Sequence, residues 1–322
     1  MVGYLCCQYL FINDGKGHFN DIAKTKNADI AHIGMVTGAV WVDITRDKQK
    51  ELIIVGEWMA PRIFSFTGDD FEEIKTNISS KFGWWQTVAA ADVNGDGRQD
   101  LILGNMGKNF YLRPDSANPV KLWMNDFDKN GSLDKIISYT VNNRDMPVFL
   151  KQDMQEQLPF IKKNNLKHQE YATKSVQDLF PGEMMEGCIV KRFDYVPSCI
   201  AINNGNGQFS IQELPTMVQL SCINAIFPMD VNEDGYIDLV MGGNQFGLLP
   251  QFERLDGSFG DILINDGKGE FTWQPSNRTG LNLRGELRDI KAIKSTKGTH
   301  VLFLQNNEFP LLYKLQTTDK RK

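Results

Sequence analysis

Short apolar runs recur along the chain and alternate with acidic or glycine-rich stretches. Three of them directly follow an aspartate: Leu101-Ile-Leu-Gly104, Lys135-Ile-Ile-Ser-Tyr139 and Leu239-Val-Met-Gly-Gly243. They are rich in branched residues and stop at glycine or polar residues, which is typical of short buried β-strands. No apolar run approaches the length of a membrane-spanning helix. The pattern predicts an all-β protein.

A nine-residue acidic loop precedes each of these runs, at residues 92–100, 126–134 and 230–238. Oxygen-bearing side chains fall at loop positions 1, 3, 5 and 9, and glycine falls at position 6. Calcium takes six to eight oxygen ligands, and alternate inward side chains of a short loop can supply them. Without a cation, the three carboxylates of each loop would repel one another strongly. The candidate side chains are Asp92, Asn94, Asp96 and Asp100 in the first acidic loop, Asp126, Asp128, Asn130 and Asp134 in the second, and Asp230, Asn232, Asp234 and Asp238 in the third.

The residues after each loop exclude an EF-hand. An EF-hand ends its twelve-residue loop with a bidentate glutamate and continues as a helix. Position 12 is here Leu103, Ile137 or Met241. We therefore expect each acidic loop to lead into a strand.

A second phrase recurs between the loops, as Ile12-Asn-Asp-Gly-Lys-Gly-His-Phe19, Ile202-Asn-Asn-Gly-Asn-Gly-Gln-Phe209 and Ile264-Asn-Asp-Gly-Lys-Gly-Glu-Phe271. Asparagine and glycine accept the positive φ of tight hairpin turns, so the phrase predicts hairpins. Residues 66–71 are a looser version. Loop, strands and hairpin recur about every 50 residues, a period typical of β-propellers.

A fourth loop has the same register but a different composition. Residues 43–51 align with 92–100 at an offset of 49 (92 − 43), with oxygen-bearing Asp43, Thr45, Asp47 and Glu51 at positions 1, 3, 5 and 9. Lys48 stands where the other loops have glycine. We expect this degenerate loop to be empty.

The loop spacing predicts an interruption. The first two loops start 34 residues apart (126 − 92), which indicates a trimmed blade, and the next interval is 104 residues (230 − 126), about two blades. Met154, Leu158 and Ile161 have helical spacing, and Pro159 suits a helix start. We predict propeller blades over 1–141, a helical insertion of two or three short helices in one blade over 142–192, and further blades over 193–322.

Both ends of the chain are interpreted as parts of blades. Residues 9–12 are expected to form a strand, so the first blade starts in the middle of its unit. Residues 288–294, 300–307 and 310–315 predict three strands without an acidic loop, as a terminal blade.

The net charge and the cysteines bear on which partners and which cross-links the chain could have. The 322-residue chain has a net charge of −5, and nine of its 40 acidic residues occupy ligand positions (3 × 3). Three bound divalent ions would bring the charge to about +1. A nucleic-acid partner therefore gains no support. The five cysteines (Cys6, Cys7, Cys188, Cys199 and Cys222) are expected to be small buried thiols, with a Cys188–Cys199 disulfide as the alternative.

The acidic loops and hairpin phrases resemble the FG-GAP, or VCBS-type, repeats of integrin-α-like β-propellers. The phrases Gly56-Glu-Trp58, Gly83-Trp-Trp85 and Gly104-Asn105 are similar to a subgroup of large secreted or surface-attached bacterial proteins often carrying an ASPIC/UnbV segment. The resemblance implies a β-propeller of about six or seven blades if complete. It also implies an extracytoplasmic location, although the N-terminus lacks the basic region of a signal peptide. The chain starts mid-blade, so we expect it to be a piece of a longer protein.

The family pattern implies three calcium sites. It adds a backbone carbonyl at loop position 7 to the four side chains of each loop. These carbonyls belong to Arg98, Ser132 and Tyr236.

The chain carries no recognised catalytic motif, and its four histidines are scattered, so surface or structural roles are expected for them. The leading hypothesis is a calcium-stabilised, non-catalytic propeller that binds protein or glycan partners at the cell surface. The alternative is the scaffold portion of a calcium-dependent polysaccharide lyase or hydrolase.

Two further groups of side chains leave both structural and binding roles open. The aromatic residues Trp84, Trp85, Phe110 and Tyr111 suit either packing between blades or stacking on sugars. The basic residues Lys162, Lys163, Lys167 and His168 suit either a solvated helix face or contact with an anionic glycan or partner.

Overall fold

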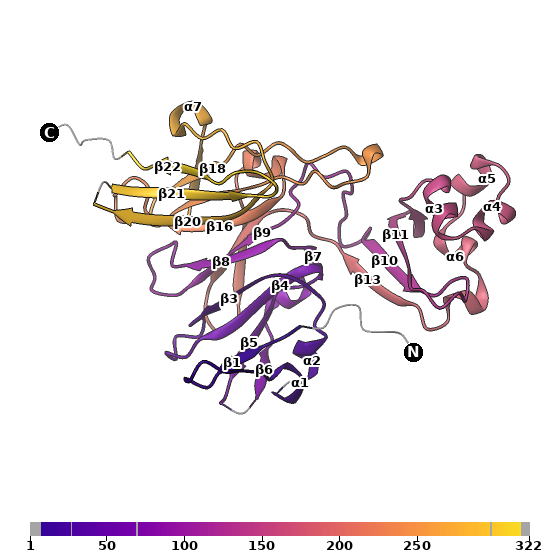
Figure 1. Ribbon diagram of the computed structural model, residues 1–322, viewed down its shortest axis with the longest axis horizontal. Coiled ribbons are helices and arrows are strands. Elements are labelled where there is room, and N and C mark those ends of the chain that lie inside the picture. The colour runs from indigo at the N-terminus through magenta and orange to yellow at the C-terminus, as the bar shows by residue number, and fades with distance from the viewer. Residues whose placement is uncertain (1–7, 27, 69, 297, 317–322) are drawn as a thin grey trace. The chain divides into compact units, whose positions relative to one another are not determined.

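The computed structural model describes residues 8–26, 28–68, 70–296 and 298–316 (Figure 1). The fold is mostly β, with several antiparallel sheets and short helices. The chain divides into two compact units. We call Leu112–Tyr195 the inserted unit, and the described residues of 8–111 and 196–316 the sheet unit. Among the described residues, none of the helices has the length and apolar character needed to cross a bilayer.

The sheet unit contains four successive antiparallel sheets and a separate hairpin. The first sheet comprises β3 (Met35–Val42), β4 (Glu51–Met59), β5 (Arg62–Phe66) and β6 (Phe71–Ile74), with β7 (Gly83–Trp84) on β4. The second comprises β8 (Thr87–Ala91), β9 (Asp100–Gly104), β14 (Cys199–Asn203) and β15 (Phe209–Glu213). The third comprises β16 (Ile223–Met229), β17 (Asp238–Gly243), β18 (Asp261–Asn265) and β19 (Phe271–Gln274). The last comprises β20 (Leu287–Ser295), β21 (Gly298–Gln305) and β22 (Leu311–Lys314), and the hairpin comprises β1 (Phe11–Asn13) and β2 (Phe19–Asp21).

Short helices complete the sheet unit. They are α1 (Ala23–Lys26), α2 (Ala28–Ala31), α7 (Ser276–Thr279) and the 3₁₀ helices Asn77–Ser80, Thr216–Leu220 and Pro250–Phe252.

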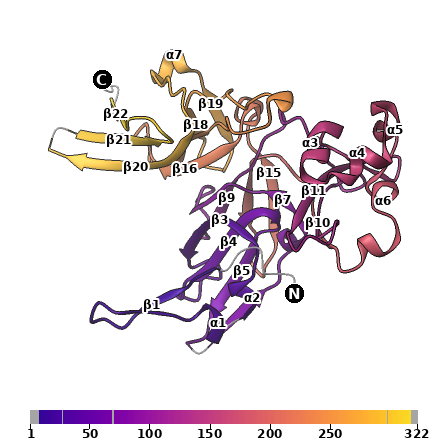
Figure 2. The ribbon, with the colours of Figure 1, turned by 45° about the vertical axis from the view of Figure 1, so that its right-hand side comes forward.

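The first strands of successive sheets, β3, β8, β16 and β20, lie against one another in this order (Figure 1). Figure 2 shows β3, β16 and β20 from a second direction. Apolar side chains from neighbouring sheets fill the space between them, for example Ile102 and Ile223. Gly104, which ends β9, permits this approach: a Cβ there would lie 2.3 Å from the carbonyl oxygen of Ile223 in the next sheet. The described residues do not close these sheets into a ring.

The local predictions for strands and hairpins are confirmed. Each acidic loop leads into a strand: β9, β11 or β17. Each hairpin phrase connects paired strands: β1 to β2, β14 to β15 and β18 to β19, with residues 66–71 joining β5 to β6. The strand expected over 9–12 instead begins at Phe11, and the three expected C-terminal strands are β20, β21 and β22.

The inserted unit has its own four-stranded sheet, ordered β12-β11-β10-β13. These strands are β10 (Val120–Asn125), β11 (Asp134–Val141), β12 (Arg144–Pro147) and β13 (Ile189–Phe193). Its helices are α3 (Lys151–Gln157), α4 (Phe160–Asn164), α5 (His168–Ala172), α6 (Val176–Leu179) and a 3₁₀ turn at Gly182–Met185. Met154, Leu158 and Ile161 are buried in its core, and Pro159 directly precedes α4, as predicted.

The inserted unit is wider than the helical segment expected over 142–192, and both expected boundaries fall inside it. The trimmed blade expected between the first two loops does not occur. Strands β8 and β9 are instead completed by β14 and β15, which follow the inserted unit in the chain. The second acidic loop therefore belongs to the inserted unit, because β10 and β11 pair with each other and with β13 or β12.

The three cysteines among the described residues are free thiols, so Cys188 and Cys199 form no disulfide. Cys199 and Cys222 are buried, as expected, and Cys188 is half-buried. Burial raises the pKa of the Cys222 thiol to about 12, which makes it unreactive at neutral pH. Cys6 and Cys7 lie outside the described residues.

Candidate metal centre

Each acidic loop connects the first two neighbouring strands of a sheet: β8 to β9, β10 to β11, and β16 to β17. The position-9 aspartate is the first residue of the second strand in every case. The degenerate loop has the same place between β3 and β4, and Glu51 begins β4. The four loops are thus one structural device repeated in four sheets.

All four loops have two residues in the left-handed region, at positions 4 and 6. At position 6 φ is +81° for Gly97, +89° for Gly131, +92° for Gly235 and +72° for Lys48. At position 4 it is +75° for Gly95, +59° for Lys129, +59° for Glu233 and +67° for Arg46. Glycine at position 6 adopts this conformation at little cost, whereas a side chain there adds strain.

The position-1 aspartate is held by backbone amides of its own loop. Asp92 accepts hydrogen bonds from the amides of Gly95 and Gly97, both at 2.8 Å. Asp126 accepts from the amides of Asn130 (2.9 Å) and Gly131 (2.8 Å). These bonds turn the carboxylate inward before any cation arrives.

The position-9 aspartates Asp100, Asp134 and Asp238 are buried. Each accepts a hydrogen bond from the amide of loop position 2, at 2.9 to 3.0 Å. Burial raises the pKa of all three carboxyl groups, and the two other carboxylates of each loop raise it further. A bound cation would favour the ionised forms and so oppose both effects.

The second acidic loop brings three carboxylates together. One oxygen each from Asp126, Asp128 and Asp134 lies within 4.8 Å of the other two. In the described part of the chain, no other group of three acidic, histidine or cysteine side chains meets this spacing. Oxygen-only donors suit a hard cation such as calcium rather than zinc. The donor set therefore fits the expected ion.

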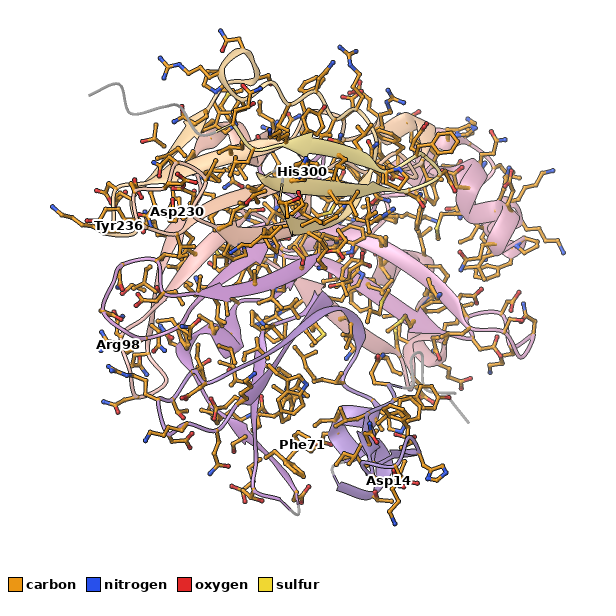
Figure 3. All side chains as sticks on the ribbon, turned by 60° about the vertical axis from the view of Figure 1, so that its left-hand side comes forward. Asp14, Phe71, Arg98, Asp230, Tyr236 and His300 are labelled. Carbon is orange, nitrogen blue, oxygen red and sulfur yellow. The ribbon has the colours of Figure 1, made fainter. Side chains whose placement is uncertain are left out.

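The first and third loops have their side chains engaged differently. In the first loop Arg98 Nη2 forms an ion pair with Asp96 at 2.5 Å, and Asn94 donates to the same carboxylate at 3.2 Å. In the third loop Asn232 donates to Asp234 at 2.8 Å. The residues occupy the predicted loop positions, and metal binding by these two loops stays a prediction. Figure 3 shows Arg98 of the first loop and Asp230 and Tyr236 of the third along the same side of the view.

The degenerate loop keeps the hydrogen bonds of the others. Asp43 accepts from the amides of Arg46 (2.7 Å) and Lys48 (2.9 Å), and buried Glu51 accepts from the amide of Ile44 (2.8 Å). Burial raises the pKa of Glu51. The loop fold thus persists without the glycine.

Two asparagines that the sequence interpretation assigned only to hairpins connect the loops of neighbouring sheets. Asn203 Nδ2 donates to the carbonyl of Ile44 at 2.9 Å, and its backbone amide donates to Asp100. Asn265 Nδ2 donates to the carbonyl of Val93 at 2.8 Å, and its backbone amide donates to Asp238. Asparagine recurs at the same place in each hairpin phrase, and this recurrence was the sequence signal for the connecting role.

The aromatic residues pack within the sheet unit, as one of their two interpretations expects. Trp85 and Phe110 are buried. Trp84 lies between Trp58 and Phe110, with ring centroids 5.4 Å and 5.6 Å away. Tyr111 stacks on Phe252 at 4.1 Å. The basic residues 162, 163, 167 and 168 are exposed, which suits both interpretations of them.

Comparison with known proteins gives one family. Residues 43–103 match the model of the FG-GAP-like repeat. The match begins at the first residue of the degenerate loop and ends in β9, so it includes the first acidic loop as well. No curated protein matches the chain significantly. The expected FG-GAP-like repeat is confirmed over residues 43–103.

Proposed function

We propose that the chain is a calcium-stabilised, non-catalytic β-propeller module that binds a protein or glycan partner at the cell surface. The observation that carries the calcium part is the meeting of Asp126, Asp128 and Asp134 within 4.8 Å. The FG-GAP-like repeat and the adjacent first strands of four successive sheets support the propeller part.

In the second loop the ion would be held by the three aspartates, the side-chain oxygen of Asn130 and the carbonyl of Ser132. Calcium supplies two positive charges there. The chain's own residues hold the loop: the amide of Phe127 donates to Asp134, and Gln157 Nε2 donates to its other oxygen at 3.2 Å. The site therefore joins the β10–β11 connection to helix α3, a structural task.

The binding task is favoured over catalysis because the acidic side chains of the loops are already engaged by backbone amides. A position outside the cell fits as well. Extracellular modules bind calcium with a Kd of about 10⁻⁴–10⁻³ M, and a loop with only three carboxylates suits an affinity in this range.

Thermal melting with calcium and with EGTA tests the calcium part. We expect calcium to raise the melting temperature, because a ligand of the native state at 100 times its Kd adds about 2.7 kcal/mol. Asp128→Ala should remove part of this gain. Glu156→Ala is the control, because it removes the same charge from an exposed position of α3. Identical melts with and without calcium would reject the proposal.

Assay of the purified chain against a panel of polysaccharides tests the non-catalytic part. We expect retention of a glycan or protein without turnover. Turnover that is lost on substitution of an acidic residue outside the loops would show an enzyme instead.

A further inference from the structure

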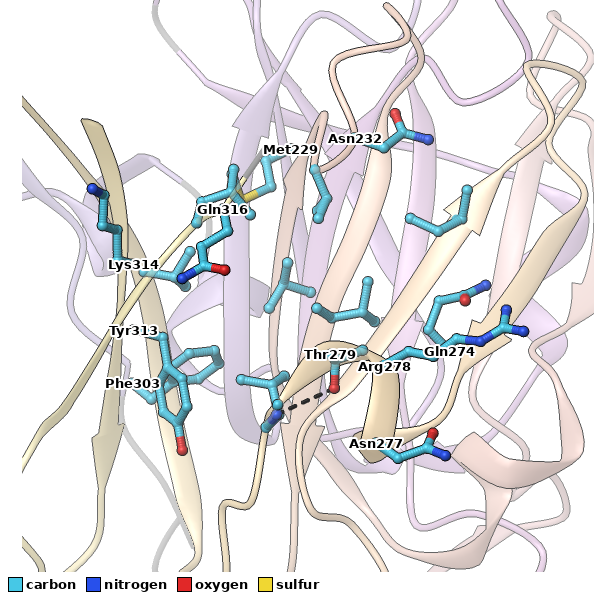
Figure 4. A pocket seen from close by; sticks show the side chains of 18 residues that line it. Met229, Asn232, Gln274, Asn277, Arg278, Thr279, Phe303, Tyr313, Lys314 and Gln316 are labelled. Atoms are coloured by element: carbon cyan, nitrogen blue, oxygen red, sulfur yellow. Dashed lines mark hydrogen bonds between the residues drawn. The ribbon is translucent and has the colours of Figure 1, made fainter. Parts of the chain in front are cut away.

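A groove of about 700 Å³ lies between the third sheet and the last sheet (Figure 4). Val231, Asn232, Ile264 and Gln274 line it from the third sheet and its acidic loop. Tyr313, Lys314 and Gln316 line the other wall. The apolar side chains of Val240, Ile262, Val301 and Phe303 also line it, as does the segment 277–281. A largely apolar lining with a few polar groups is typical of a binding site.

The corresponding space between the second and third sheets is filled by the chain's own hairpin of residues 265–271. A Cβ on Gly269 of this hairpin would lie 3.6–3.7 Å from Ile202, Asn94 and Val93. Gln212 Nε2 donates to the carbonyl of Gly269 at 3.1 Å. Asn265 Nδ2 donates to the carbonyl of Val93 at 2.8 Å.

The four residues that contact this hairpin are Val93, Asn94, Ile202 and Gln212, and each has a counterpart in the open groove. Loop alignment equates Val93 and Asn94 with Val231 and Asn232, at an offset of 138 (231 − 93). Hairpin alignment equates Ile202 and Gln212 with Ile264 and Gln274, at an offset of 62 (264 − 202). All four counterparts line the groove. Among the described residues the last sheet has three strands and no such hairpin to fill it.

The β1–β2 hairpin has nearly the same sequence as the hairpin that fills the space between the second and third sheets. Residues 12–19 differ from residues 264–271 only at His18, where the other hairpin has Glu270. Every residue of β1 and β2 is exposed. Phe19 is 62% exposed and Phe11 56%, whereas the equivalent Phe209 of the second sheet is 4% exposed. Tyr9, which is 67% exposed, stacks on Phe11, so the exposed aromatic side chains form a cluster, and clusters of this kind mark interaction surfaces.

We propose that this groove binds the β1–β2 hairpin of a second copy of the chain. Asn13 Nδ2 of the incoming hairpin donates to the carbonyl of Val231, and Gln274 Nε2 donates to the carbonyl of Gly17. Hairpin and groove are different surfaces, so the contact is head-to-tail and extends to further copies. A contact between a hairpin tip and a groove buries little surface, so the association is weak and transient.

Two single substitutions separate the two surfaces. Asn13→Asp removes the donor but keeps the Oδ1 that accepts the Gly15 amide at 2.8 Å, so the turn is retained. Gln274→Glu removes the donor of the groove. Light scattering after size-exclusion chromatography should show concentration-dependent oligomers for the wild type, and at least tenfold weaker self-association for each variant. The controls Asn20→Asp and Asn282→Asp make the same charge change at exposed positions and should associate like the wild type.

Mixing the two variants is the decisive measurement. The Gln274→Glu chain still has a hairpin and the Asn13→Asp chain still has a groove, so an equimolar mixture should form one-to-one dimers and nothing larger. A synthetic peptide of residues 9–21 should dissociate the wild-type oligomers. A wild type that stays monomeric at several hundred micromolar, or variants that associate like the wild type, would overturn the proposal. Peptide binding by a monomeric wild type would also overturn it, because the occupant would not be a second copy.

Discussion

At position 6 of the degenerate loop, the backbone has a left-handed conformation that favours glycine over other residues. Lys48 has φ of +72°, where the three acidic loops have glycine. Its backbone amide donates to Asp43, so the chain keeps the turn despite the strain. A left-handed conformation costs a residue with a Cβ about 1–2 kcal/mol.

We therefore predict that Lys48→Gly stabilises the protein by about 1 kcal/mol. Relief of left-handed strain exceeds the entropy that glycine adds to the unfolded chain. Urea unfolding monitored by tryptophan fluorescence measures the change. The control is Lys50→Gly, two positions on and outside the left-handed region, which should destabilise by about 0.5–1 kcal/mol. Equal effects of the two substitutions would contradict the strain argument.

Asp261 is a buried carboxyl group at the start of β18, outside the acidic loops. It accepts hydrogen bonds from Ser258 Oγ and Trp273 Nε1, both at 2.8 Å. Burial nevertheless raises its pKa above the usual value. The ionised form is therefore disfavoured in the folded chain. The free-energy cost is fully present above the folded pKa, decreases as the pH falls below that value, and is gone below the unfolded pKa.

Asp261→Asn should accordingly raise the free energy of unfolding at pH 7, by about 1.4 kcal/mol for each pH unit between the folded and unfolded pKa values. Asparagine can keep both hydrogen bonds, since its oxygen accepts from Trp273 and its amide donates to Ser258. Unfolding curves at pH 7 and at pH 4 should show the advantage shrinking at the lower pH. A destabilised variant at pH 7 would show that the charge itself is needed.

At the scale of elements, the hairpin asparagine joins three pieces of chain. Asn265 binds the carbonyls of Val93 and Ile237 through Nδ2, and its Oδ1 accepts the amide of Gly267 at 3.0 Å. One buried side chain thus fixes its own hairpin, its own loop and the loop of the neighbouring sheet.

Asn265→Ala should destabilise the sheet unit by about 2–4 kcal/mol, because it leaves two carbonyls and the amides of Gly267 and Gly269 without this partner. The matched control is Asn13→Ala in the exposed β1–β2 hairpin, which should cost less than about 1 kcal/mol. Both are read from chemical denaturation of monomeric protein. A small effect of Asn265→Ala would mean that water replaces the amide at the sheet boundary.

The local elements could be predicted from the sequence because their signals are short-range. Oxygen at positions 1, 3, 5 and 9 with glycine at 6 specifies one turn, and the apolar run that follows specifies a strand. The Asn-Asp-Gly and Asn-Asn-Gly phrases likewise specify the hairpins. The role of Asn203 could not be predicted, because its partner carbonyl belongs to Ile44, far away in sequence.

At the scale of the whole molecule, the inserted unit interrupts one sheet between β9 and β14. Sequence spacing located the helices but not the unit, since its limits are set by pairing between β10 and β13. The sequence of neither strand contains a pattern that identifies the other as its pairing partner. The ends of the interruption meet in the sheet unit, where the amide of Gly107 donates to the carbonyl of Val196 at 2.9 Å.

This junction predicts that the inserted unit can be removed. Replacement of residues 112–195 by a short Gly/Ser linker should leave a cooperatively folded sheet unit, because the adjacent ends already meet. The isolated segment 112–195 should fold separately and bind one calcium ion per chain through the second loop. Circular dichroism melts and calorimetric titration measure both. Loss of cooperative melting in the shortened chain would show that the two units depend on each other.

The interruption of the second sheet also fixes the order in which its strands become available during synthesis. Strand β14 pairs with β9, yet 94 residues separate the end of β9 at Gly104 from the start of β14 at Cys199 (199 − 104 − 1). At about 5–20 residues per second, the ribosome takes roughly 5–20 seconds to deliver the missing strand. During this interval the edge of β9 is uncovered while the inserted unit can already fold. The nascent protein therefore presents one unpaired edge of an apolar strand, which favours aggregation until the second sheet is complete.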